Sequence, residues 1–137
     1  MNPRRIDVFF YGLFMETDAL RAMGARPANP RIGRVDGFAL RIGRRATLTP
    51  ESGSQVYGIV TELTHAEIQL IYSEPGVHDY RPEAVTVELD DGTGLPALCF
   101  MLPKAPGAEE VNQEYARRLR DLALRLGLPP GYVNAIA

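Results

Sequence analysis

Six short segments of the chain have the pattern of β-strands, and several of them are joined by connections too short to hold a crossover helix. Their β-branched and aromatic residues suit a pleated surface. The clearest pair covers residues 81–89 and 95–102, which Asp90, Asp91 and Gly92 join as a hairpin turn. The other expected strands cover residues 6–10, 35–43, 44–50 and 55–63. Because parallel strands need long crossovers, this pattern argues against a doubly wound parallel sheet.

Three helical segments complete the pattern. The first covers residues 19–24 with Thr17 as its cap, and the second opens at a capping box formed by Thr64 and Glu67. The long third helix, residues 111–126, has an apolar stripe. We therefore expect an α+β fold, a small and partly closed mixed or antiparallel β-barrel of about six strands. Short helices and one long C-terminal helix would pack outside it, in a single domain over residues 1–137.

Two further segments are expected to be connections without regular structure, and two glycines are expected to have particular roles. Residues 26–30 contain two prolines and predict a loop, and residues 51–54 predict a turn. Gly127 is expected to end the long helix. A glycine at position 58, in the middle of an expected strand, indicates a bulge or a close approach by another backbone.

The composition excludes some classes of partner. The chain has 137 residues, 45% hydrophobic and 23% charged, with a formal net charge of −2. This charge gives no reason to expect nucleic acid or an anionic membrane surface as a partner. Arg4 and Arg5 precede an apolar run, as in a signal peptide, but Asp7 interrupts the run and no cleavage site follows it. No stretch has the length needed to span a membrane.

The single cysteine and two histidines limit redox and metal chemistry. Cys99 cannot form an intramolecular disulfide, and its apolar neighbours predict a buried, inert thiol. The lack of disulfides fits a cytoplasmic protein. His65 and His78 have no partner at ligand spacing, so no metal site is predicted. There is also no Gly-x-Ser-x-Gly elbow and no phosphate-binding loop.

Gly12 follows the first strand and precedes the first helix by a few residues. A glycine there lets the backbone turn sharply, and the N–H groups between a strand end and a helix start can bind an anion. The alternative is that Gly12 only allows a tight connection. Spacing alone does not separate these two interpretations.

Two further features could mark a site or could be ordinary surface. Glu74 lies in the most constrained loop, directly before Pro75 and Gly76. A carboxylate in a partly apolar pocket has a raised pKa and can accept a proton near neutral pH, whereas an exposed loop acid has no such role. Arg44 and Arg45 are adjacent and could also mark a site, although a solvated strand end explains them equally.

Four stretches, taken in order, resemble the γ-glutamylcyclotransferase-like family, which includes the plant avirulence-induced-gene-like proteins. The first contains Tyr11-Gly12-Leu13 after a strand, similar to the Tyr-Gly-Ser/Thr-x-Leu of the family. The second is a strand with glycine near its centre. The third is similar to a Glu-Gly…Tyr-x-Arg loop and strand, and the fourth to a closing Gly-Leu-Pro-x-x-Tyr. The stretches are residues 8–15, 56–63, 72–85 and 126–133.

This resemblance implies a barrel with a cavity and a reaction that needs no cofactor. The backbone of the Tyr-Gly loop would hold the carboxylate or amide end of a γ-glutamyl group. Glu74 would act as general acid/base, taking a proton from the substrate's α-amine as it attacks the γ-carbonyl and closes 5-oxoproline. The implied substrate-binding residues are Tyr11, Gly12, Leu13, Phe14, Met15 and Tyr80. The rings of Tyr80 and Tyr132 could instead only pack in the core.

The sequence also departs from the family pattern. Leu13 stands where a serine or threonine is usual, and Pro75 stands where a glycine commonly follows the glutamate. The favoured hypothesis is an enzyme of the cyclotransferase type acting on a γ-glutamyl compound. One alternative is a non-catalytic small-molecule binding domain on the same fold, and another is an amide lyase or hydrolase that still uses Glu74. Homodimerisation is left open.

Overall fold

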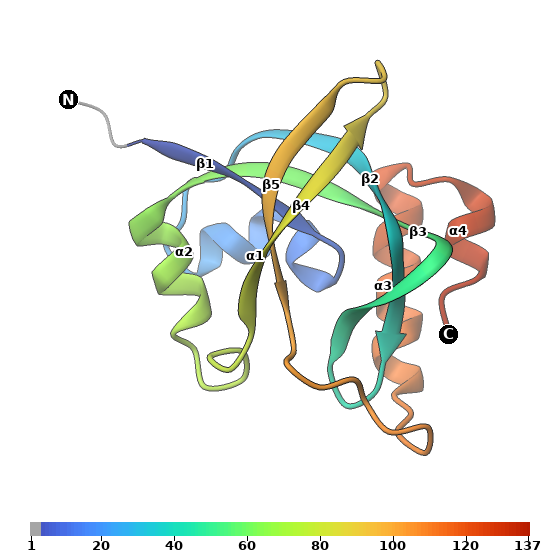
Figure 1. Ribbon diagram of the computed structural model, residues 1–137. Coiled ribbons are helices and arrows are strands. Elements are labelled where there is room, and N and C mark those ends of the chain that lie inside the picture. Colours follow the sequence, from blue (N-terminus) through green and yellow to red (C-terminus); the bar gives the residue numbers. More distant parts are fainter. Residues whose placement is uncertain (1–3) are drawn as a thin grey trace.

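The computed structural model describes residues 4–137 and contains a closed β-barrel with helices packed outside it (Figure 1). Around the barrel the order is β1-β3-β2-β4-β5. Neighbouring strands are antiparallel except β1 and β5, which pair in parallel at Val8 and Leu98. The strands are β1 (Arg5–Phe10), β2 (Ala28–Ile42), β3 (Ala46–Thr64), β4 (Arg81–Leu89) and β5 (Gly94–Met101). The expected mixed barrel is therefore confirmed.

The number of strands differs from the expectation because two expected strands are one. β3 runs without a break through residues 51–54, which were expected to form a turn. Four residues of β3 oppose only Gly37 between the pairs Asp36–Gln55 and Phe38–Pro50. A bulge of this kind absorbs extra residues while the strand stays in the sheet. The structure thus has five strands within residues 4–137 where the sequence pattern suggested six.

The expected loop at residues 26–30 is also wrong in part, since β2 begins at Ala28. Asn29 has a φ of 53°, and the register between β2 and β3 shifts between Ala28 and Arg31. Pro30, which cannot donate to a ladder, lies inside this irregular stretch. Pro27 lies before the strand, and Pro30 did not prevent it because the pairing is interrupted where Pro30 stands.

The helices are α1 (Thr17–Ala22), α2 (His65–Tyr72), α3 (Gln113–Leu126), α4 (Pro130–Asn134) and the 3₁₀ turn η1 (Leu13–Met15). The capping box that opens α2 is present, and Gly127 ends α3 in the left-handed region, both as expected. Thr17 is not a cap, because the N-cap of α1 is Glu16 and makes no side-chain bond. α4 was not expected, although Pro130 suits the first position of a helix. No helix within the described residues is long and apolar enough to cross a membrane.

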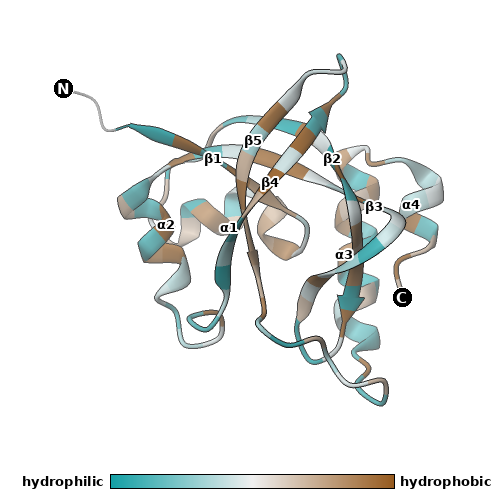
Figure 2. Ribbon diagram, viewed as in Figure 1, coloured by the Kyte–Doolittle hydropathy of each residue, from teal (hydrophilic) through white to brown (hydrophobic). Residues whose placement is uncertain are grey.

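β1 is buried on both faces, and this explains its unbroken apolar sequence. Phe9 and Tyr11 belong to the cluster inside the barrel, whereas Val8 and Phe10 belong to the cluster between the barrel and the helices. Figure 2 shows β1 changing from hydrophilic at its outer end to hydrophobic where it enters the barrel. Gly58 of β3 faces this strand closely, since a Cβ there would lie 2.2 Å from the carbonyl oxygen of Phe10. The expected close approach of a backbone is confirmed.

Candidate functional site

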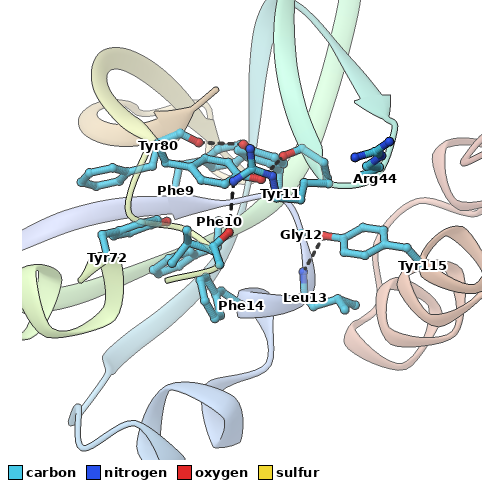
Figure 3. Close-up of a pocket in the computed structure, with 15 residues that line it drawn as sticks. Phe9, Phe10, Tyr11, Gly12, Leu13, Phe14, Arg44, Tyr72, Tyr80 and Tyr115 are labelled. Carbon is cyan, nitrogen blue, oxygen red and sulfur yellow. Dashed lines mark hydrogen bonds between the residues drawn. The ribbon is translucent and has the colours of Figure 1, made fainter. Parts of the chain in front are cut away.

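A cavity of about 320 Å³ lies where β1 ends. Its wall is built from the end of β1 and the Gly12 loop, the turn between β2 and β3, the end of α2 with the loop that follows it, β5 and α3 (Figure 3). The wall is largely aromatic. The aromatic residues that line it are Phe9, Phe10, Tyr11, Phe14, Tyr72, Tyr80, Phe100 and Tyr115.

The ring of Tyr72 is at the centre of this aromatic wall. It stacks on Phe100 with 3.9 Å between ring centroids and an interplanar angle of 16°. Phe14 meets Tyr72 edge-on at 6.1 Å, and Phe10 meets Phe14 in the same way. Edge-to-face pairs of this kind are favourable arrangements of aromatic rings, and the Tyr72–Phe100 stack packs the two rings in direct contact. The rings therefore fix one another and give the cavity a preformed shape.

The Gly12 loop is held against α3 by one hydrogen bond. The backbone N–H of Leu13 donates to the Tyr115 hydroxyl at 3.3 Å (Figure 3). A Cβ at position 12 would lie 2.5 Å from the same hydroxyl oxygen, so the loop needs glycine for space. The N–H of Met15 donates to the carbonyl of Gly12. Within residues 4–137, the N–H of Phe14 donates to no protein acceptor.

The tyrosines of the wall are not bases at neutral pH. Tyr11 donates to the carbonyl of Phe100 at 2.6 Å, and Tyr80 donates to the carbonyl of Ala46 at 2.5 Å. Burial raises the pKa of Tyr11 and of Tyr72 well above the ordinary value, and it raises the pKa of Tyr80 to about 12. Burial also raises the pKa of Tyr115. Each phenol therefore keeps its proton.

Arg45 ties the turn between β2 and β3 to the loop after α2. Its guanidinium donates to both carboxylate oxygens of Asp79, at 2.6 and 2.9 Å, and to the carbonyl of Gly76 at 3.1 Å. It also lies over the Tyr80 ring, 5.5 Å from the centroid. The hydrogen bonds from Arg45 lower the pKa of Asp79 to about 2, so this carboxylate is ionised and paired.

Residues 8–121 match the model of the family described as gamma-glutamyl cyclotransferase, AIG2-like. The chain belongs to this family. No curated protein sequence matches the chain significantly. Solved structures confirm the fold. A gamma-glutamyl cyclotransferase superposes with a TM-score of 0.81 at 20% identity, covering 98% of this chain and 89% of the other.

Two further solved structures of this fold come from mammals. The protein loc79017 of Homo sapiens has a TM-score of 0.78 at 22% identity, covering 97% of this chain and 88% of the other. An AIG2-like protein of Mus musculus has a TM-score of 0.62 at 16% identity, covering 81% and 90%. At these identities the likeness establishes the shared fold.

In this member of the gamma-glutamyl cyclotransferase family, five of the residues that the resemblance suggests for substrate binding line the cavity. They are Tyr11, Gly12, Leu13, Phe14 and Tyr80. Met15 is not at the cavity wall, because its side chain is 2% exposed in the core between the barrel and the helices. Tyr132 is also outside the wall and packs edge-on against Tyr57.

Glu74 is exposed and does not line the cavity. Within the described residues its carboxylate makes no hydrogen bond or ion pair, and only its carbonyl is used, accepting from the N–H of Val77 at 3.0 Å. Gly76 and Val77, which follow it in the same loop, do line the cavity. Glu74 itself is thus outside the lining of the cavity that the Gly12 loop borders, and its role as general acid/base stays a prediction.

Sequence reasoning missed several wall residues. Tyr72 and Tyr115 were assigned to the apolar faces of their helices, where an aromatic residue gives no sign that its hydroxyl end reaches a cavity. Arg44 and Arg45 were recognised as a pair, but the pattern did not show that they face the Gly12 loop. No cluster of histidine, cysteine, aspartate or glutamate able to hold a metal occurs within residues 4–137.

Proposed function

We propose that this family member binds a small organic molecule with an apolar or aromatic body in the cavity beside Gly12, without acid–base catalysis. The observation that carries this proposal is the make-up of the wall. None of the residues that line the cavity has a carboxylate or imidazole side chain. The cavity volume of about 320 Å³ is at the small end of the range for ligand sites. Aromatic rings offer contact area, but neutral phenols accept no proton at neutral pH.

The second candidate function is the cyclisation of a γ-glutamyl compound to 5-oxoproline. Membership of the gamma-glutamyl cyclotransferase family favours it. The α-amine of the substrate would attack the γ-carbonyl, the amide bond would break, and Glu74 would carry the proton from the attacking amine to the leaving amine. A general base must come within hydrogen-bond reach of the proton it removes. The loop that holds Glu74 would have to turn its carboxylate toward the cavity for this reaction.

The experiment incubates the protein with a panel of γ-glutamyl amino acids and measures 5-oxoproline and the released amine. If the protein binds its ligand without catalysis, as proposed, 5-oxoproline should not form above the uncatalysed rate. Turnover that is lost in Glu74→Gln and kept in Glu83→Gln would establish the cyclotransferase instead. Glu83 is a suitable control because it is exposed on β4 and its carboxylate makes no ion pair within the described residues.

Binding itself is tested by nuclear magnetic resonance titration with small aromatic compounds. Val77→Trp places a large ring at the cavity wall and should abolish the shifts of the wall residues. Val111→Trp makes the same change at a side chain that is 75% exposed and should leave them intact. Binding that persists unchanged in Val77→Trp would place the binding site elsewhere.

A further inference from the structure

The two adjacent arginines of the cavity differ in what they contact. Arg45 is fully engaged with Asp79 and Gly76, so its charge is paired by the protein. Arg44 also lines the cavity, but its guanidinium makes no hydrogen bond or ion pair within residues 4–137. Figure 3 shows the Arg44 side chain apart from the bonded network around Tyr80. A cationic group without a partner at the wall of a cavity attracts an anion.

The backbone that carries Arg44 is fixed. Its N–H donates to the carboxylate of Glu110 at 3.2 Å, and its carbonyl accepts from the side-chain amide of Asn112 at 3.1 Å. The other carboxylate oxygen of Glu110 accepts from the N–H of Gly107 at 2.9 Å. Both carboxylate oxygens of Glu110 are thus used for backbone groups. A guanidinium presented from an anchored turn loses less freedom when it binds a ligand.

The rest of the wall restricts where a charged group of a ligand could lie. The interior is aromatic, and the hydroxyls of Tyr11 and Tyr80 already donate to backbone carbonyls. The Tyr72 hydroxyl makes no hydrogen bond within the described residues and is therefore a free polar group among the rings. A charge buried among rings without partners is costly, so an anionic group belongs beside the exposed guanidinium.

We propose that Arg44 forms a carboxylate subsite of this cavity, so that its ligand is a small monocarboxylate with an aromatic or branched apolar body. This inference rests on the binding function proposed above. The body lies among Phe14, Tyr72 and Phe100, and the carboxylate lies on the Arg44 guanidinium. An uncharged group of the ligand that accepts hydrogen bonds would meet the Tyr72 hydroxyl.

The test compares 3-phenylpropanoate with the neutral 3-phenylpropanamide by isothermal titration calorimetry. The two probes have the same apolar body and differ in charge. Wild-type protein should bind the acid up to about fivefold more tightly than the amide, which is the upper end of the gain from a solvent-exposed ion pair. Arg44→Gln should remove this preference and leave the affinity for the amide unchanged. Arg26→Gln is the matched control, since Arg26 is exposed, outside the cavity wall, and its guanidinium makes no hydrogen bond or ion pair within the described residues.

Three results are informative in different ways. A preference for the acid that survives in Arg44→Gln would overturn the subsite, as would equal affinity of wild type for both probes, while binding in the cavity would stand. If the wild type bound neither probe, the proposed binding function would fail and the subsite with it. Thermal melting of Arg44→Gln checks that an unfolded variant is not the cause, and Arg44→Lys should retain part of the preference.

Discussion

Replacing Gly58 with alanine tests whether the barrel wall depends on the close approach of β1 and β3. An alanine Cβ would lie 2.2 Å from the carbonyl oxygen of Phe10 and 2.8 Å from a ring carbon of Phe9. Ordinary contacts between a carbon atom and an oxygen or carbon atom begin at about 3.5 Å. The oxygen belongs to the backbone of a strand that is paired on both sides, so it cannot rotate away. The two strands must separate, and Phe9 and Phe10 of the cavity wall must move with them.

The expected loss of stability follows from two opposing effects. Overpacking a core typically costs about 1–3 kcal/mol, and contact with backbone belongs at the upper end of that range. Restricting the unfolded chain by Gly→Ala returns about 0.4–1 kcal/mol. The net loss is about 2 kcal/mol. Unfolding entropy of about 2.1 cal/mol/K per residue gives roughly 0.3 kcal/mol/K for 137 residues, so the melting temperature should fall by about 7 °C.

Circular dichroism melts of Gly58→Ala and Gly131→Ala measure this difference. A Cβ at Gly131 would meet nothing within 4 Å, and the residue lies in α4, where alanine is favoured. That control should melt at or slightly above the wild-type temperature. A melting temperature for Gly58→Ala within about 2 °C of wild type would refute the claim that the two strands are in hard contact at this point.

Three other predictions concern the cavity and the barrel interior. Tyr115→Phe should lower stability by about 1 kcal/mol in urea unfolding, because the N–H of Leu13 loses its acceptor. Asp79→Asn should be less stable than wild type at neutral pH, because Arg45 depresses the pKa of Asp79 from 3.8 to about 2. This difference in stability should be present above about pH 4 and should disappear as the pH falls through about 2. Cys99, which is 0% exposed and whose pKa is raised by burial, should react with a thiol reagent only after denaturation.

The mixed barrel could be predicted because its signals are local. Turn residues such as Gly92, the capping box at Thr64 and the helix stop at Gly127 each act within a few residues of the chain. The errors arose where pairing across the sheet overrides local preference. Residues 51–54 stay in β3 because they form a bulge of that strand opposite Gly37, and no property of the segment alone shows this.

The site was predicted in part for a related reason. The Gly12 loop could be found because a glycine between a strand and a helix is a local feature. The rest of the wall includes Arg44, Tyr72 and Tyr115, which are brought together by closure of the barrel and by the packing of α2 and α3. Only their positions in the fold give these residues a shared environment. The role of Glu74 was inferred from the resemblance, whereas the pattern alone also allowed the exposed position that the structure shows.

The bond between Leu13 and Tyr115 changes how this cavity can recognise a ligand. The resemblance assigns ligand recognition to the backbone N–H groups of the loop, but here the protein itself uses the N–H of Leu13. A ligand oxygen would have to displace the Tyr115 hydroxyl and leave a partly buried polar group without that partner, which typically costs about 1–3 kcal/mol. The N–H of Phe14 and the Arg44 guanidinium carry no such cost, because neither has a protein partner within residues 4–137. Tyr115→Phe should therefore strengthen the binding of a ligand held by the loop and leave unchanged the binding of one held by Arg44.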